Sequence, residues 1–202
     1  MTPVQQMRAI SLGSGGVAGA AVGLLIYAFW PQPAKLAAAL KESCSLLTED
    51  AEAHRSEHAA EVQLPFLQAR QPEITLVPIA LGTGHLETLE ALGMAIAEVV
   101  AAQDEPVIII ASSDMNHYES DQITRVKDRM AIDRILALDP RGLFDTVIKE
   151  NISMCGFGPT VAMLTAANKL GATSAELIRY ATSGDVSGDR NMVVGYAGLA
   201  VR

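Results

Sequence analysis

The sequence predicts an α/β domain in which helices cover a sheet, because strand-like and helix-like segments alternate along the chain. The strongest strand signal is residues 106–111, a β-branched and uncharged run bounded by polar residues. Residues 75–81 form a second short apolar run, of the kind found in buried strands. Between these two runs, residues 86–102 repeat Leu, Ile and Val at helical spacing, which predicts a helix.

Further helices are predicted where capping residues and helix breakers bound a segment. Residues 34–47 are rich in Ala and Leu and predict a helix before the first apolar run. Ser120 is a suitable N-cap for a later helix, and the apolar residues expected on one face of that helix are Ile123, Val126 and Met130. Asp139 followed by Pro140 is typical of an N-cap and the first helical position of another helix.

The C-terminal part predicts one more helix and two strands. Gly158 and Pro159 open the helix, and Gly171 closes it. Strands are expected at residues 177–181 and 192–201, and the loop between them reads Ser-Gly-Asp-Val-Ser-Gly-Asp-Arg-Asn.

Composition excludes several classes of protein. With 202 residues, 50% of them hydrophobic and 19% charged, the chain is not intrinsically disordered and is long enough to bury a sizeable core. Two cysteines cannot form a disulfide framework, so we expect a reduced, cytoplasmic setting. The 15 Lys and Arg against 23 Asp and Glu give a net charge of -8, which argues against nucleic-acid binding because phosphates are neutralised by basic residues.

The first residues differ from the rest of the chain. Residues 1–41 contain no acidic residue, and residues 13–30 are an uncharged run that ends in aromatic residues. This run reaches the minimum of about 17–20 residues for a membrane span, but five of its residues are glycines, which disfavour a helix. Four interpretations of this run remain open: a membrane anchor, a signal peptide, a buried segment, and a segment foreign to the domain. The membrane anchor is less favoured. We therefore divide the chain into an atypical apolar segment, residues 1–33, and an α/β domain, residues 34–202.

Asp114 and His117 directly follow the strand predicted at residues 106–111. In open α/β sheets, ligands bind just outside the carboxyl ends of strands. A carboxylate and an imidazole at such a position supply a general base with an orienting partner, or a metal ligand. The alternative is a turn in which polar side chains cap the next helix. We favour a catalytic pair, with His117 as the base and Asp114 as its orienting group.

Cys155 lies just before the helix that Gly158 and Pro159 open. A thiol near a helix N-terminus ionises more readily, which suits a metal ligand or a reactive group. The alternative is a small buried hydrophobic residue, which is how most free cysteines behave. Cys44 lies in the Ala- and Leu-rich segment and is expected in the core.

Two other groups of polar residues are less specific. His54 and His58 are four residues apart, so they would share one face of a helix, although an acidic helix start exposed to solvent is the simpler interpretation. Asp185 and Asp189 each follow a glycine. Such pairs are typical of tight turns, and they can also place carboxylates over a site.

Five segments stand out in order along the chain: EHAAEVQLPFLQ, VPIALG, SSDMNHY, MCGFGPTVAML and TSGDVSGDRNMVVGYAG. Taken together they resemble the Memo family, whose bacterial and archaeal members are called AmmeMemoRadiSam system protein B. The resemblance covers about residues 34–202 and is specific because five motifs occur in the same order. It implies a fold similar to that of class III extradiol dioxygenases, which use non-haem iron, and a pocket with a metal site for iron or copper.

The resemblance also implies roles for particular residues. Cys155 matches a metal ligand of the family, and His117 matches a histidine that lines the same pocket. The residues that match further motif positions in the pocket are Glu57, His58, Asp114, Asp185 and Asp189. The family segments His-Ala-Gly-Tyr and Gly-Pro-Ser-His do not occur in this sequence. The two histidine ligands of the family therefore have no counterpart here, and we expect a remnant of the metal site in a family member that is incomplete at its N-terminus.

These observations lead to one expected function with alternatives. We expect a metal-dependent redox activity similar to that of a dioxygenase. The alternatives are a non-catalytic module that binds a peptide or a small anion, and an inactive truncated member of the family. Expected partners are a small molecule or peptide in the pocket and the radical SAM protein of the AmmeMemoRadiSam system. Loss of the first strands would expose an apolar sheet edge, so we also expect a homo-oligomer.

Overall fold

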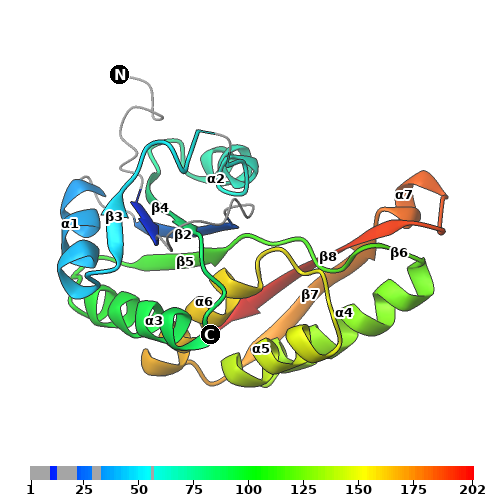
Figure 1. Ribbon diagram of the computed structural model, residues 1–202. Helices are drawn as coiled ribbons and strands as arrows, with labels where there is room; N and C mark the ends of the chain where they lie inside the picture. Colours follow the sequence, from blue (N-terminus) through cyan, green and yellow to red (C-terminus); the bar gives the residue numbers. More distant parts are fainter. Residues whose placement is uncertain (1–9, 13–21, 29–32, 56) are drawn as a thin grey trace.

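A five-stranded sheet forms the first half of the protein (Figure 1). The computed structural model describes residues 10–12, 22–28, 33–55 and 57–202. Within them the strand order is β3-β1-β4-β2-β5, with β1 parallel to β4 and the other pairs antiparallel. The strands are β1 (Ile10–Leu12), β2 (Val22–Ala28), β3 (Leu47–Glu49), β4 (Thr75–Leu81) and β5 (Val107–Ala111).

A second sheet, with the strand order β6-β8-β7, lies beside the first one (Figure 1). Its strands are β6 (His117–Glu119), β7 (Ala175–Thr182) and β8 (Val193–Val201). β7 and β8 pair along almost their whole length, whereas β6 pairs only with Val193 and Val194 at the start of β8. Most of β8 therefore has a strand partner on one side only within the described residues.

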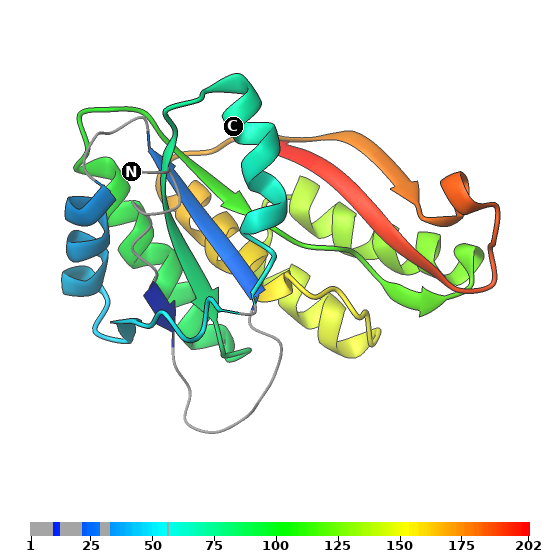
Figure 2. The same cartoon turned by 90° about the horizontal axis from the view of Figure 1, so that it is seen from above.

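Helices cover both sheets (Figure 2). In the first half, α3 packs against α1 and α6 on one face of the five-stranded sheet, while α2 lies on the other face. In the second half, α4 packs against β7, β8 and α5. The helices are α1 (Pro33–Ser43), the short 3-10 helix η2 (Glu61–Gln63), α2 (Leu64–Arg70), α3 (Leu86–Ala101), α4 (Asp121–Leu136), α5 (Pro140–Lys149), α6 (Phe157–Lys169) and α7 (Gly184–Ser187).

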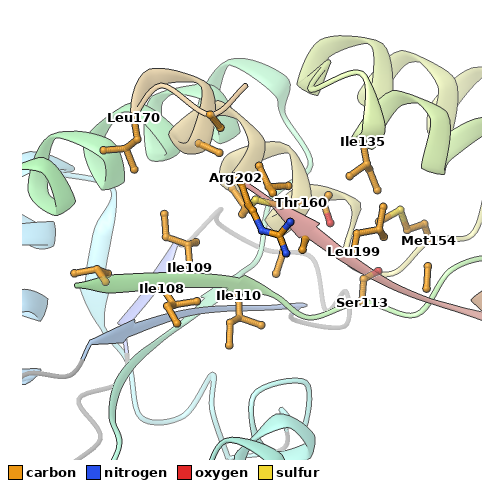
Figure 3. A pocket seen from close by; sticks show the side chains of 18 of the residues that line it. Ile108, Ile109, Ile110, Ser113, Ile135, Met154, Thr160, Leu170, Leu199 and Arg202 are labelled. Carbon is orange, nitrogen blue, oxygen red and sulfur yellow. The ribbon is translucent and has the colours of Figure 1, made fainter. Parts of the chain in front are cut away.

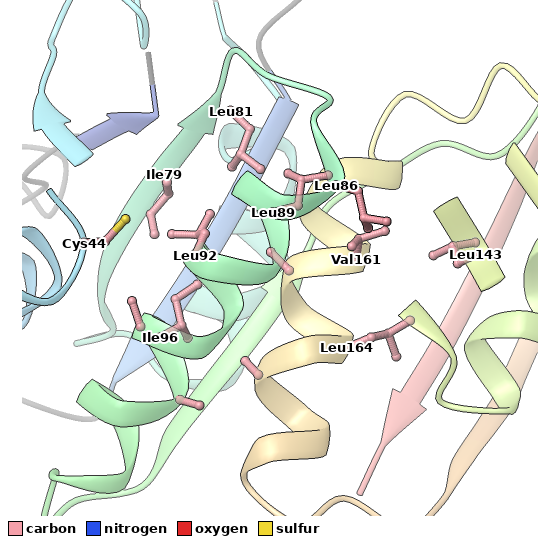
Figure 4. Packing of buried hydrophobic residues seen from close by; sticks show 14 of the residues in the cluster. Cys44, Ile79, Leu81, Leu86, Leu89, Leu92, Ile96, Leu143, Val161 and Leu164 are labelled. Carbon is pink, nitrogen blue, oxygen red and sulfur yellow. The ribbon is translucent and has the colours of Figure 1, made fainter. Parts of the chain in front are cut away.

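The main core lies between β4, α3 and α6 (Figure 4). Leu89, Leu92 and Ile96 follow one another at helical spacing along α3, and all three are fully buried. They meet Ile79 of β4 and Val161 of α6 in one continuous cluster. Burial of each such side chain contributes about 1.5–3 kcal/mol to the free energy of unfolding. This cluster therefore fixes the positions of β4 and α6 and of the loops attached to them.

Several predicted elements are confirmed. The strands expected at residues 75–81 and 106–111 are β4 and β5, and the helix between them is α3. Ser120 caps α4, since its hydroxyl accepts the N–H of Ile123, and Asp139 caps α5 by accepting the N–H of Gly142 at 2.8 Å. A mixed α/β fold is therefore shown, and its likeness to the dioxygenase fold stays a prediction.

Two predictions about helices were wrong. The helix expected at residues 34–47 ends at Ser43, because Leu47–Glu49 leaves it to pair with β1. His54 and His58 do not share a helix face, because residues 51–55 form a turn and residues 57 and 58 have no regular structure.

The prediction of which face of α4 is buried was also wrong. Ile123, Val126 and Met130 are all exposed. The side of α4 that packs on the second sheet carries Thr124 and Asp128 instead. Burial of Asp128 depends on its hydrogen bond from Tyr180, which is 52 residues away in the chain and which a hydrophobicity pattern does not register.

Part of the apolar segment at residues 13–30 is a strand rather than a membrane-spanning helix. Residues 13–21, 29 and 30 lie outside the described residues. Val22–Ala28 is β2, which pairs with β4 on one side and β5 on the other. Across the described part of the chain, no helix combines the length and the apolar character needed to cross a membrane. The division of the chain at residue 33 stays a prediction.

Candidate functional site

Two segments that are far apart in the sequence meet at the end of β5. One is the loop of residues 112–116, which follows β5, and the other is residues 153–156, which lead into α6. The N–H of Gly156 donates to Ser113 Oγ at 2.8 Å. A Cβ atom at residue 156 would overlap the side chain of Ser113 and the carbonyl oxygen of Ser112. Only glycine therefore allows these segments to approach so closely.

This approach brings Asp114, His117 and Cys155 together. One ligand atom from each residue lies within 4.8 Å of the other two, and we call this group the Asp–His–Cys cluster. His117 Nε2 is 3.5 Å from Asp114 Oδ2. The N–H of Asp114 donates to Cys155 Sγ at 3.2 Å. Three of the residues selected from the sequence thus form one site, and Cys155 lies just before a helix as expected.

Ser153 contacts both the backbone and the ring of His117. Ser153 Oγ accepts the backbone N–H of His117 at 2.7 Å, and the Ser153 carbonyl oxygen is 2.5 Å from His117 Nδ1. A carbonyl oxygen can only accept a hydrogen bond, so Nδ1 carries the proton. The other ring nitrogen, Nε2, faces the carboxylate of Asp114.

Next to the cluster lie the buried Asn116 and Asp128 and the half-buried Tyr180, which we call the inner network. The N–H of Asn116 donates to Asp128 Oδ1 at 2.8 Å, and the Tyr180 hydroxyl donates to Asp128 Oδ2 at 2.6 Å. Burial raises the pKa of Asp128, and these two hydrogen bonds oppose that rise. Burial and the bond to this carboxylate also raise the pKa of Tyr180 far above its usual value. The inner network connects to the cluster because Asn116 Oδ1 accepts the N–H and the hydroxyl of Ser153, each at 3.1 Å.

Two further tyrosines flank the cluster. Tyr118 is next to His117 and has a left-handed backbone φ of 58°, where the pairing of β6 with β8 is irregular. Such an irregularity changes the direction of the neighbouring side chains. Burial raises the pKa of Tyr196, and the carboxylate of Asp114 raises it further. Tyr196 is thus a phenol close to the cluster that sequence reasoning did not select.

Asp185 and Asp189 are not brought to the Asp–His–Cys cluster. Asp185 accepts two hydrogen bonds from Arg125, at 2.8 and 2.9 Å, and one from the N–H of Thr182 at 2.9 Å. The Thr182 N–H and then Arg125 hold the pKa of Asp185 below its usual value. Asp189 accepts the backbone and side-chain N–H groups of Asn191, each at 2.9 Å. These contacts fit the alternative of a structural role for both residues, and their place in the pocket stays a prediction.

Arg125 and Asp185 belong to an exposed group of ion pairs, which we call the outer network. Asp121 accepts from Arg125 Nε at 2.8 Å and from Arg190 at 2.7 Å. Arg190 also reaches Asp185 at 3.1 Å. The outer network ties α4 to α7 and has no hydrogen bond or ion pair with His117 or Cys155 in the described part of the chain.

Glu57 and His58 precede η2 and lie outside the cluster. Glu57 Oε1 accepts the N–H of Ala59 at 2.6 Å, and His58 is exposed. The same segment nevertheless reaches the loop after β5, because Gln63 of η2 donates to Ser112 Oγ at 3.0 Å. Gln63 lies in the EHAAEVQLPFLQ motif, so this motif adjoins the loop that carries Asp114, although Glu57 and His58 do not join the cluster.

Comparison with known proteins agrees with this arrangement of motifs. Residues 33–200 match the family model described as Memo-like protein. A MEMO1 family protein of Methanopyrus kandleri is 42% identical over 192 residues, which cover 91% of this chain and 68% of that protein. A MEMO1 family protein of Methanosarcina barkeri is 47% identical over 158 residues, covering 78% of this chain and 60% of that protein. The chain thus spans roughly 60–68% of the length of these relatives. On the family match and these identities, the chain belongs to the Memo family.

Proposed function

We propose that the Asp–His–Cys cluster binds one iron or copper ion and that the protein carries out metal-dependent redox chemistry similar to that of a dioxygenase. The proposal concerns the part of the protein that this chain shares with its longer relatives. The support comes from the types of donor atom, from their spacing and from the way in which His117 is held.

The donor set suits a transition metal. Asp114, His117 and Cys155 offer an oxygen, a nitrogen and a sulfur atom within 4.8 Å of one another. Metal–ligand bonds of about 2.0–2.3 Å place neighbouring ligand atoms about 3–4 Å apart, so small side-chain movements suffice. Sulfur and imidazole ligands favour copper, iron and zinc over magnesium and calcium. Three protein ligands with an open position are typical of catalytic rather than structural metal sites.

The surroundings of His117 carry the proposal. Nδ1 faces the carbonyl oxygen of Ser153, and Nε2 lies 3.5 Å from the carboxylate of Asp114. Hydrogen-bond acceptors therefore stand at both ring nitrogens, whereas a neutral imidazole has only one N–H. A metal ion on the Nε2 side would accept the lone pair of Nε2 and also neutralise the carboxylate of Asp114. Donation of the other ring N–H to a backbone carbonyl is the usual arrangement of a metal-binding histidine.

The chain's own residues then have distinct roles. Ser153 fixes the ring of His117 and the tautomer that presents Nε2. The N–H of Asp114 donates to the sulfur of Cys155 and orients it. A bound metal ion would act as a Lewis acid and exchange electrons with a bound substrate. Tyr196, whose pKa is raised by burial and by Asp114, keeps its proton at neutral pH and stays an uncharged hydrogen-bonding group.

Elemental analysis tests the metal site. Purified protein is loaded without oxygen with Fe(II), Cu(I) or Zn(II) and then desalted. We expect about one metal ion per chain, and a loss of at least about tenfold in affinity in Cys155→Ser and His117→Gln. The matched control is Cys44→Ala, because Cys44 is the other free cysteine and is buried in the core. Equal metal content in Cys155→Ser and the control would overturn the proposal.

A second experiment tests whether a metal reaches His117. Without a metal, His117 and Asp114 would belong to an acid–base site or to a binding module for a peptide or small anion. Imidazole NMR signals that do not change on addition of any of the three metals would favour this alternative. Oxygen uptake with catechol-like compounds tests the likeness to dioxygenases, which rests on the family resemblance. Association with a radical SAM protein, formation of a homo-oligomer and a cytoplasmic location stay predictions.

A further inference from the structure

A cavity of about 630 Å³ separates the two sheets (Figure 3). β5 lies on one side of it, β8 on another, and α6 also lines it. In Figure 3, Ser113 and Met154 lie at one end of the cavity and Leu170 lies at the other. The described residues that line it are mostly aliphatic, and Arg202 alone among them is charged. The cavity is therefore long, apolar and bounded by strands.

The first strand edge along this cavity belongs to β5. β5 pairs with β2 on one side, and within the described residues no strand pairs with its other side. Its sequence, Val-Ile-Ile-Ile-Ala, is as apolar as that of a fully buried strand. Ile108 nevertheless is 49% exposed, and the other four residues are only partly buried. An unpaired apolar edge of this kind is normally covered in native proteins.

The second strand edge belongs to β8. The N–H and carbonyl of Gly195 bond to Asn116 and Met115, on the side away from β7. At the other end of the strand, Arg202 and Ser174 exchange hydrogen bonds at 2.9 and 3.0 Å, on the side of β7. Backbone groups alternate between the two sides of a strand. Those of Ala197, Leu199 and Val201 therefore point away from β7, and all three residues line the cavity.

We propose that an extended segment of a separate polypeptide inserts between β5 and β8 as an added strand. A strand residue between packed layers occupies roughly 160 Å³, from the spacings along a strand, between strands and between sheets. A cavity of 630 Å³ thus accommodates about four residues of such a segment. The inserted strand would satisfy the backbone groups of both edges and join the two sheets, which is the known mode of peptide binding by β-augmentation.

The lining also defines the chemistry of the segment. The side chains of the segment are small or β-branched, and those on the face toward α6 are apolar, because Ala167 and Met163 of α6 and Ala197 of β8 line the cavity. An acidic group fits only at the end near Arg202, whose guanidinium otherwise contacts the exposed Glu176 at 3.3 Å. A small apolar molecule would fill the same volume but would leave the backbone groups of β5 and β8 without partners. Insertion of the segment does not depend on a metal at the Asp–His–Cys cluster.

Amide hydrogen exchange tests the insertion directly. The probe is an acetylated and amidated peptide, Thr-Val-Thr-Val-Thr-Glu, and the control peptide has proline in place of the second valine. We expect about tenfold slower exchange at Ala197, Leu199 and Val201 with millimolar probe peptide. The proline peptide lacks the central N–H, so it should give no slowing. Both measurements use the unaltered chain.

A pair of variants tests whether the slower amide exchange arises from peptide bound in the cavity. Ile109→Lys puts a charge on the cavity side of β5, which is a common way to block strand addition. Ile178→Lys is the matched control, because Ile178 is 59% exposed on β7 and does not line the cavity. Slowing by the probe peptide should disappear in the first variant and persist in the second.

Four results would overturn the proposal. They are no slowing in the unaltered chain, equal slowing by the proline peptide, equal slowing in both variants, and protection that grows with protein concentration without peptide. The last result would mean that a second copy of this chain occupies the cavity.

Discussion

The inner and outer networks both hold α4, yet they stabilise the protein in different ways. In the inner network, the carboxylate of Asp128 is completely buried and its partners are uncharged. In the outer network, the carboxylate of Asp185 is exposed and its main partners are the guanidinium groups of Arg125 and Arg190. Buried hydrogen bonds are costly to break, whereas exposed ion pairs contribute little and are screened by salt. The inner network should therefore fix the site, and the outer one should mainly fix a loop.

The largest effect is expected where a side chain would enter the inner network. A Cβ atom at residue 195 would overlap Asp128 Oδ2 and press on Met115. Gly195→Ala should lower the free energy of unfolding by about 3 kcal/mol, because overpacking here also displaces a buried carboxylate. Urea denaturation measures the change. Gly198→Ala on the same strand is the control, since a Cβ there meets nothing within 4 Å. A similar loss in both variants would contradict the role of Asp128 in this packing.

The next effect concerns the partners of Asp128. Asp128→Ala leaves the Tyr180 hydroxyl and the Asn116 N–H without their acceptor, and should cost about 2–3 kcal/mol of unfolding free energy. Asp128→Asn keeps one acceptor oxygen and should cost less. The double variant Asp128→Ala with Tyr180→Phe should recover part of the loss, because it removes one unsatisfied donor. Strict additivity of the two single variants would show that this hydrogen bond contributes nothing.

Most of the fold could be predicted from the sequence, and the exceptions have a common cause. β4, α3 and β5 follow from local patterns of apolar residues, and the caps Ser120 and Asp139 from local chemistry. The buried side of α4 could not be predicted in this way. Tyr180, the partner of Asp128, is 52 residues away, and only the folded chain brings the two together.

The candidate site likewise contains residues that local sequence predicts and residues that only the folded chain brings together. Asp114 and His117 share one loop, so their proximity could be predicted from the sequence, whereas Cys155 is 41 residues from Asp114 and joined the expected site through the family resemblance. Ser153 sits beside the selected Cys155 but carries no catalytic signature, because its role depends on its backbone carbonyl. Asp185 and Asp189 were expected in the pocket from their motif, yet arginine and backbone partners that no motif specifies hold them outside the Asp–His–Cys cluster.

A smaller effect is expected at the contact between the inner network and the Asp–His–Cys cluster. Ser153→Ala removes the hydroxyl that holds the His117 N–H and Asn116 Oδ1, but keeps the carbonyl at Nδ1. Stability should fall by about 1 kcal/mol, and metal affinity by about tenfold, as for other groups that orient a ligand. Competition with a chelator measures the affinity. Ser187→Ala, at an exposed position on α7, is the control. Unchanged affinity in Ser153→Ala would remove Ser153 from the positioning of His117.

The smallest effects distinguish the two networks by the sign of their pH dependence. The pKa of Asp128 is raised in the folded protein, mainly by burial. Its contribution to stability is complete below the unfolded value of about 3.9 and is lost as the pH rises through its folded pKa. The pKa of Asp185 is lowered, first by the Thr182 N–H and then by Arg125. Its contribution is present above about pH 3.9 and is lost as the pH falls toward its folded pKa.

Urea denaturation from about pH 3 to 6 therefore separates the two carboxylates. Relative to the unaltered protein, Asp128→Asn should become less destabilising as the pH rises, and Asp185→Asn should become less destabilising as the pH falls. Added salt should reduce the effect of Asp185→Asn and leave that of Asp128→Asn nearly unchanged, because only exposed charges are screened. Arg125 of the outer network lowers the pKa of Asp128 but less than burial raises it. If both variants shifted in the same direction with pH, this attraction would outweigh burial, and the two networks would be a single electrostatic unit.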